Sequence, residues 1–326
     1  MKWLFVILII GAIVYTFRDT AGPILGQLKK TSPSVLAGLC GMSVMYCLIE
    51  ALITTVLARQ YVPGFCYKWG IENMFFCSFY RVATLGSGSG VAAIIYLNEH
   101  GVEYSSGFGM YMLQYAFHKI SIAIYSAIFF VISWGYMCRH FGGYTWLLLA
   151  GYAVTMLITL ALILFCCSAK FHQMIFAIID FFNKKGKMDA LETQLREHCE
   201  QLEAASKYLL KNKKMVAGVI GLNIIKLCFW YGMPYLIFRG CGQINLIETM
   251  AITSLSVMLA AVLPSPAGIG STEFVFTGLF AGIVGTGMAG SASLLYRFAT
   301  FVFPFLIGIV TVIARRVREH RAMENL

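Results

Sequence analysis

The chain has 326 residues, of which 59% are hydrophobic and only 12% are charged. A typical soluble domain carries about 25% charged residues, so this composition excludes an ordinary water-soluble globule. It also excludes collagen, a disordered chain and a small disulfide scaffold. We therefore expect a single transmembrane domain over residues 1–326.

The long apolar stretches predict membrane-spanning helices, because about 20 apolar residues are needed to cross the hydrocarbon core. The first stretch, Trp3–Phe17, is short, lacks an A-x-A-like cleavage site and ends abruptly at Arg18, so we interpret it as an anchor helix rather than a signal peptide. Five longer stretches predict an all-α polytopic membrane protein. They are residues 34–57, 107–137, 144–167, 215–238 and 288–314.

Two further apolar regions are interrupted in the middle. Residues 71–97 contain Gly86–Gly90, and residues 246–286 contain Pro264–Gly270. Glycine and proline at this density stop a helix, and each half is short for a full crossing. We therefore predict two broken, re-entrant helical hairpins, each of which enters and leaves the membrane on one side. Irregular backbone at that depth requires protein or a wet cavity around it.

The remaining segments predict the orientation. Residues 58–70, 168–214 and the basic tail 315–326, together with Lys2, hold 16 of the 25 Lys and Arg residues, whereas the opposite loops hold five. The positive-inside rule then places both termini in the cytoplasm. The net charge of +10 thus arises mostly from these cytoplasmic segments and does not indicate nucleic-acid binding.

Residues 168–214 form the most hydrophilic segment, with 15 of the 40 charges. Met188–Lys211 is typical of an amphipathic helix, and Phe171–Phe182 is typical of a more apolar helix at the membrane interface. We interpret 168–214 as a cytoplasmic amphipathic linker between two halves. A regulatory or partner-docking role stays open.

The sequence also repeats itself at a spacing of 178 residues. This shift places the first breaker motif on the second, Gly107–Met110 on Gly285–Met288, and Lys119 on Arg297. Repeat 1 would then cover 34–137, repeat 2 would cover 215–314, and the linking transmembrane helix 144–167 would invert the second copy. Inverted repeats with broken helices that meet near the midplane are found in many secondary transporters.

Eight ionisable residues lie within apolar segments: Arg81, Lys119, Lys226, Arg297, Glu50, Glu72, Glu248 and Glu273. A charge in the membrane is costly unless it is paired or hydrated, so these residues are candidates for function. Cations at matching places in both repeats suit a phosphate, which guanidinium binds bidentately. Structural ion pairs between the repeats are the alternative. Glu273 could cap its half-helix or pair with an amine or a proton, and His118 is more typical of a satisfied core residue.

The ten cysteines and six histidines are scattered, and no CxxC motif occurs. Free cysteine behaves as a small hydrophobic residue. This spacing suits neither a zinc site nor a disulfide framework, so we expect no metal and no cofactor.

The segment Leu263–Glu273, which reads LPSPAGIGSTE, resembles the P-x-P-x-G-x-G-x-x-E signature of the lysylphosphatidylglycerol synthase transmembrane family, the flippase-like membrane region of the multiple peptide resistance factor. The resemblance covers nearly the whole chain, and Arg297 lies at the expected distance. Together with the repeat, it implies a substrate-binding site and no catalytic residue. The expected site residues are Arg81, Ser87, Gly88, Gly90, Lys119, Pro264, Ser265, Pro266, Gly268, Gly270, Glu273 and Arg297.

The resemblance implies that the protein binds and translocates an anionic or aminoacylated phospholipid, or a polyprenyl-phosphate lipid, in the bacterial plasma membrane. The alternative is a phosphatidylglycerol lysyltransferase that uses lysyl-tRNA, although such chemistry should need a domain of about 150 residues outside the membrane. A structural or regulatory membrane subunit is a third reading. The leading reading involves no nucleic acid and leaves homo-oligomerisation open.

Overall fold

The computed structural model describes residues 11, 18, 21–182, 189–240, 244–263, 265 and 268–324. Within these residues the chain forms helices and no β-strand, which confirms the all-α prediction. The predicted anchor helix Trp3–Phe17 lies outside the described residues, apart from Gly11.

In the part of the chain that the structure describes, five helices are long and apolar enough to cross a membrane, so the chain is a multi-pass membrane protein. Each backbone N–H and C=O in hydrocarbon needs an internal partner, and an uninterrupted helix supplies it. The five are α3 (Pro33–Ala58), α6 (Tyr104–Ile132), α8 (Thr145–Cys167), α11 (Lys213–Phe238) and the run of α14 (Thr286–Arg297), a π-helical turn (Phe298–Val302) and α15 (Phe303–Glu324).

Each interrupted apolar region forms two short helices that pack against each other. The first hairpin consists of α4 (Tyr67–Ala83) and α5 (Ser89–Glu99), and the second of α12 (Leu246–Val262) and α13 (Ser271–Val284). The backbone reverses through left-handed conformations, with φ of +99° at Gly86 and +70° at Gly268. Glycine adopts this conformation without a steric penalty.

The first hairpin tip lies slightly earlier in the chain than predicted. Residues 84–88 form the turn, whereas Ser89 and Gly90 already belong to α5. Gly90 is needed for packing instead, because a Cβ atom there would lie 2.8 Å from the Tyr111 ring on α6. The predicted helix 107–137 also ends early, at Ile132, and a separate short helix follows it.

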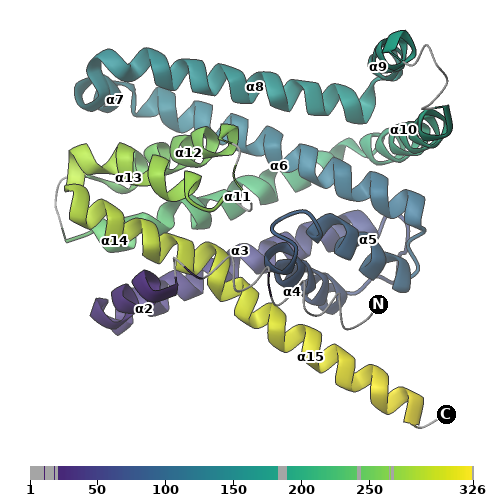
Figure 1. Cartoon of the computed structure of the whole chain (residues 1–326), viewed down its shortest axis with the longest axis horizontal. Coiled ribbons are helices and arrows are strands. Elements are labelled where there is room, and N and C mark those ends of the chain that lie inside the picture. Colours follow the sequence, from purple (N-terminus) through teal and green to yellow (C-terminus); the bar gives the residue numbers. More distant parts are fainter. Residues whose placement is uncertain are drawn as a thin grey trace.

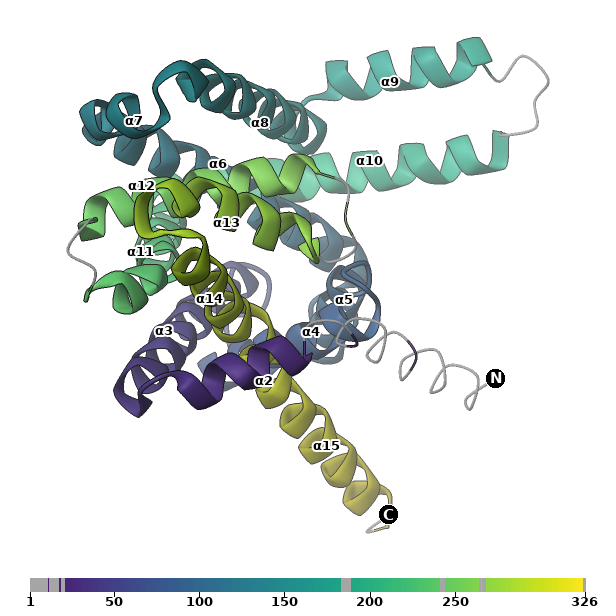
Figure 2. The same ribbon diagram turned by 60° about the vertical axis from the view of Figure 1, so that its left-hand side comes forward.

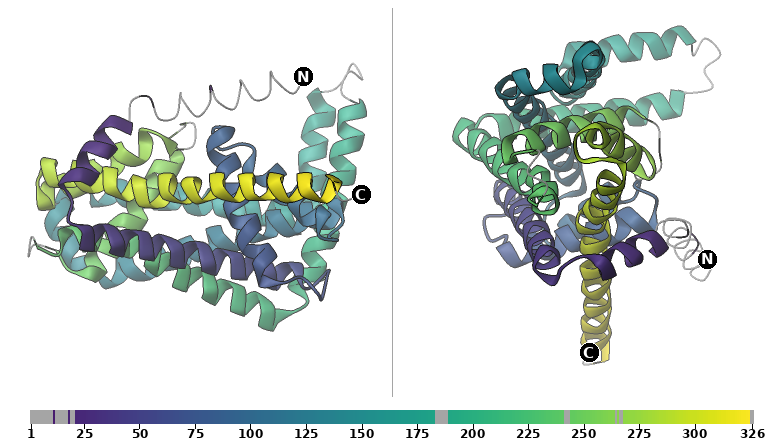
Figure 3. Two further views of the ribbon diagram at one scale, coloured as in Figure 1. Left: turned by 90° about the horizontal axis from the view of Figure 1, so that it is seen from below. Right: turned by 90° about the vertical axis from the view of Figure 1, so that its left-hand side faces the viewer.

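The shorter helices lie at the two ends of the bundle (Figure 1). At one end are α2 (Ala21–Lys30) and α7 (Trp134–Phe141), which is joined to α8 by a 3₁₀ turn (Gly142–Tyr144). At the other end, α9 (Ala169–Phe182) and α10 (Asp189–Leu210) project sideways as a pair (Figure 2). Figure 3 shows this pair standing crosswise to α3 and α15. The two helices predicted within 168–214 are therefore present.

Two apolar clusters define these ends. One joins Leu57, Phe65 and Leu97 to Leu209, and the other joins Leu28 and Met137 to residues such as Ile283. We call the first end the basic end, because most cations outside the bundle lie there. They include Arg59, Lys68, Lys207, Lys211, Lys213, Lys214, Arg315, Arg316 and Arg318.

The two hairpins connect to opposite ends of the bundle. The first begins and finishes at the basic end, and the second at the far end, so their tips point toward each other. Both halves also share one element order: a long helix, a hairpin and a long helix. The aligned segments Gly107–Met110 and Gly285–Met288 occupy different places, since Gly107 lies inside α6 whereas Gly285 separates α13 from α14. A two-fold axis between the halves stays a prediction.

Candidate functional site

A cavity of about 410 Å³ lies where the two hairpin tips meet the middle of the long helices. Gly86 comes from the first tip, and Thr272 from the first turn after the second tip. The cavity is also lined by side chains of α4, α6, α11, α12 and the α14–α15 run. These are Arg81, Tyr115, Lys119, Trp230, Val257, Tyr296, Arg297, Thr300 and Phe301. We call it the central cavity.

Three of the predicted cations therefore line one space. Arg81 is exposed to it from the last turn of α4, and Lys119 is half-buried near the middle of α6. The Lys119 ammonium lies 5.3 Å from the centre of the Tyr115 ring, within cation–π range. Among the described residues, neither Arg81 nor Lys119 forms an ion pair with a carboxylate. The central cavity thus carries two uncompensated positive charges.

The third cation, Arg297, is 91% buried and is paired with an acid. Its Nε atom lies 3.3 Å from Oε1 of Glu273, and its guanidinium lies 4.0 Å from the centre of the Phe301 ring. The other carboxylate oxygen of Glu273 accepts a hydrogen bond from the Gly270 backbone N–H at 2.9 Å. Glu273 therefore caps α13 and holds Arg297, and it is not among the residues that line the cavity.

The second hairpin tip is built close to this pair. The hydroxyls of Ser265 and Ser271 lie 2.6 Å apart. Gly268 has a φ of +70°, and a Cβ atom there would lie 3.9 Å from Nη1 of Arg297. Gly270, with a φ of +83°, begins α13. The predicted site residues Pro264 and Pro266 lie outside the described residues.

The hydrogen bonds of the first hairpin tip join residues within the tip. The Ser87 hydroxyl donates to the Thr84 carbonyl at 2.8 Å, and the Gly88 N–H donates to the Thr84 hydroxyl at 2.6 Å. Gly90 packs against Tyr111. Ser87 and Gly88 therefore shape the turn and Gly90 packs α5 against α6, and none of the three lines the central cavity.

A second cluster of charges lies between α3, α6 and α11. The Lys226 ammonium contacts Oε2 of Glu50 at 2.5 Å, Oδ1 of Asn223 at 2.6 Å and Nδ1 of His118 at 3.1 Å. Gln114 donates to the other oxygen of Glu50 at 2.9 Å. For Lys226 and Glu50 the structural alternative therefore holds, since the pair joins the first half of the chain to the second. His118 is a satisfied core residue.

A small polar cavity of about 90 Å³ separates this cluster from the central cavity. Glu50, Gln114 and Tyr111 line it, and Arg81 lines both cavities. A volume of this size accommodates a few water molecules. Arg81 is therefore the residue that connects the polar interior to the central cavity.

The two remaining intramembrane acids lie near the ends of the bundle. Glu248 forms a capping box with Asn245 at the start of α12. Glu72 accepts hydrogen bonds from Arg318 and Tyr96, each at 3.0 Å. These interactions pair each carboxylate with nearby groups, and neither acid lines the central cavity.

The aromatic and hydroxyl residues of the cavity were not predicted. Tyr115 precedes Lys119 by four residues, and Thr300 and Phe301 follow Arg297 by three and four, so helical periodicity from the cations points to them. Trp230 lies on α11, where the ring centres of Trp230 and Tyr46 are 3.8 Å apart. No sequence signal distinguishes it from the other aromatic residues of an apolar chain.

No curated protein sequence matches the chain. One sequence family, described as the lysylphosphatidylglycerol synthase TM region, matches residues 3–308. This match includes both hairpins, the first four long helices, the last one as far as residue 308, and every residue that lines the central cavity. The chain therefore belongs to the family of the lysylphosphatidylglycerol synthase transmembrane region.

Proposed function

We propose that the protein binds the headgroup of an anionic or aminoacylated phospholipid, or of a polyprenyl-phosphate lipid, in the central cavity and translocates it across the membrane. The observation that carries this proposal is the pair of uncompensated cations, Arg81 and Lys119, beside the paired Arg297. Charges inside a membrane protein are costly without a counter-charge. A lipid phosphate supplies that charge, and the family description refers to a phospholipid.

The hairpins support the translocation step of this proposal. Their tips meet at the central cavity, while their open ends connect to opposite ends of the bundle. A movement of one hairpin would open the cavity to one side, and a movement of the other would open it to the opposite side. Transporters with inverted repeats use this arrangement for alternating access. We infer that the basic end faces the cytoplasm of a bacterial cell.

The direct test is translocation of a fluorescent phosphatidylglycerol analogue by the purified protein in vesicles. Arg81→Gln and Lys119→Gln should each slow translocation by about tenfold or more, because a hydrogen bond to a charged group contributes roughly 1.5–3 kcal/mol. Arg239→Gln and Lys214→Gln are matched controls, since both residues are exposed and lie outside the cavity.

Arg297→Gln is a less direct test, because it also leaves Glu273 without its ion-pair partner. The double variant Arg297→Gln/Glu273→Gln separates the two effects. Loss of translocation in a stable double variant supports headgroup binding. Parental translocation rates in both Arg81→Gln and Lys119→Gln would refute the proposal, and lysyl-lipid synthesis from lysyl-tRNA by such a preparation would favour the transferase instead.

A further inference from the structure

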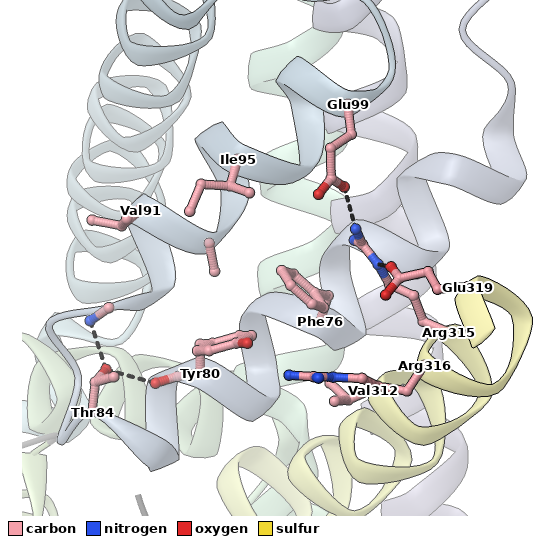
Figure 4. Close-up of a pocket in the computed structure, with 12 residues that line it drawn as sticks. Phe76, Tyr80, Thr84, Val91, Ile95, Glu99, Val312, Arg315, Arg316 and Glu319 are labelled. Carbon is pink, nitrogen blue, oxygen red and sulfur yellow. Dashed lines mark hydrogen bonds and ion pairs between the residues drawn. The ribbon is translucent and has the colours of Figure 1, made fainter. Parts of the chain in front are cut away.

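A separate groove of about 480 Å³ lies on the outside of the first hairpin, between α4, α5 and α15 (Figure 4). We call it the hairpin groove. It shares no lining residue with the central cavity. It extends from Thr84 and Gly88 at the hairpin tip to Glu99 and Glu319 at the basic end.

The polarity of the groove changes along its length. Toward the tip, its wall is formed by apolar side chains of α5 such as Val91 and Ile95, whereas Phe76 lies beside Arg315 nearer the basic end. Val91 and Ile95 are 61% and 40% exposed. The charged residues of the wall lie toward the basic end. They are Glu99 of α5 and Arg315, Arg316 and Glu319 of α15. This gradient matches a lipid whose chains lie deep and whose headgroup lies at the interface.

The length of the groove fits one leaflet. Helix α5 has 11 residues, which at a rise of 1.5 Å per residue gives a wall of about 16 Å. Half of a hydrocarbon core of about 30 Å is about 15 Å. A lipid in the leaflet next to the basic end could therefore lie along the groove with its chains against the hairpin.

The charges at the basic end of the groove are balanced. Arg315 donates to Glu99 and, at 2.8 Å, to Glu319. Its guanidinium also lies 4.9 Å from the centre of the Phe76 ring. Arg316 extends across the groove toward Tyr80 (Figure 4), and among the described residues it forms no ion pair with a carboxylate. Two arginines thus face two glutamates.

This balance distinguishes the groove from the central cavity, which has an excess of positive charge. Arg316 and the Tyr80 hydroxyl are available to donate to a phosphate. Glu99 and Glu319 have exposed side chains, at 40% and 53%, and can accept from an ammonium group beside their bonds to Arg315. A headgroup that carries both a phosphate and an amine complements this arrangement better than a purely anionic one.

We propose that the hairpin groove is a second lipid site, which holds one zwitterionic, amine-bearing phospholipid of the leaflet next to the basic end. The phosphate binds at Arg316, the amine lies between Glu99 and Glu319, and an acyl chain lies against Val91 and Ile95. The site does not depend on translocation through the central cavity.

The test is lipid binding to the purified full chain, measured by native mass spectrometry during titration with phosphatidylethanolamine or phosphatidylglycerol. The parental protein should bind one phosphatidylethanolamine at this site more tightly than phosphatidylglycerol. Arg316→Gln should weaken that binding by about tenfold, since it removes the charged donor to the phosphate. Val91→Trp should also weaken it by filling the groove. Glu319→Gln should lower the preference for phosphatidylethanolamine while phosphatidylglycerol binding is kept.

Matched controls are Arg321→Gln and Val310→Trp, because both residues are exposed and lie outside the groove. Lys119→Gln separates this site from the central cavity and should leave the bound phosphatidylethanolamine unchanged. The proposal is overturned if Arg316→Gln and Val91→Trp bind phosphatidylethanolamine as the parental protein does. It is equally overturned if Lys119→Gln removes that lipid, or if Glu319→Gln leaves the lipid preference unchanged.

Discussion

Lys226 has one acceptor for each of its three ammonium hydrogens, namely Glu50, Asn223 and His118. It is only 1% exposed, so water cannot replace a lost partner. A buried charge is tolerated when its geometry is this complete, whereas removing one partner leaves an uncompensated ion. We therefore assign Lys226 a structural role, which contrasts with that of Lys119.

Lys226→Met should lower the stability of the protein by roughly 3–5 kcal/mol, because it leaves the half-buried Glu50 without its counter-ion. The measurement is thermal unfolding in detergent. The double variant Lys226→Met/Glu50→Gln should recover part of the loss, and Lys214→Met serves as an exposed control. Equal stability of the parental protein and Lys226→Met would show that the ion pair does not hold the two halves together.

Helix α6 shows how neighbouring residues serve different sites. Gln114 and His118, four residues apart, face the ion-pair cluster. Tyr115 and Lys119, one position further on, line the central cavity. Successive residues on a helix are about 100° apart, so a single step along the chain is enough to change the face. A movement of α6 would therefore affect both sites together.

At the scale of elements, a glycine allows two helices to approach closely. A Cβ atom on Gly308 of α15 would lie 2.6 Å from the carbonyl oxygen of Phe75 and 2.9 Å from the backbone nitrogen of Phe79, both on α4. Small residues allow membrane helices to approach in this way. The same contact sets the width of the hairpin groove, because α4 and α15 form two of its walls.

Gly308→Ala should destabilise the protein by roughly 1–3 kcal/mol, since backbone atoms cannot yield as a flexible side chain does. The control is Gly278→Ala in α13, where nothing lies within 4 Å of the new Cβ atom. That change should be neutral or stabilising by up to about 1 kcal/mol, because alanine favours a helix. Thermal unfolding of both variants under one condition gives the comparison, and equal melting temperatures would contradict the close packing.

The elements that the bilayer constrains could be predicted, and those set by packing could not. Hydrocarbon demands long apolar helices, so all five long stretches correspond to helices in the structure. Glycine-rich and proline-rich interruptions likewise located both hairpins. The end of α6 at Ile132 and the π-helical turn after Arg297 had no composition signal, because the flanking residues remain apolar.

The candidate site could likewise be predicted only in part. Intramembrane cations are rare, so Arg81, Lys119 and Arg297 could be identified from the sequence, and they line one cavity. The pairing of Lys226 with Glu50, 176 residues earlier, depends on how α3 and α11 pack and has no local signal. Aromatic residues of the cavity wall resemble the many others that face lipid or the core.

At the scale of the whole molecule, charge is sorted between the two ends. Arginine and lysine gather around α9, α10, the connection after α3 and the end of α15, whereas the far end has few cations, such as Arg139 and Arg239. Cytoplasmic loops carry an excess of Lys and Arg in membrane proteins. This distribution predicts that α2, α7 and the open end of the second hairpin lie on the outer side of the membrane.

The reactivity of one cysteine tests this orientation. Cys138 is exposed on α7, at the end opposite the basic one. A membrane-impermeant maleimide added to intact cells should therefore label the parental protein, and Cys138→Ser should lose that label. The difference between the two proteins isolates Cys138 from cysteines elsewhere, such as the half-buried Cys66 near the basic end. If Cys138 reacts only after the membrane is opened, the molecule has the reverse orientation, the first hairpin opens outward, and the hairpin groove faces the outer leaflet.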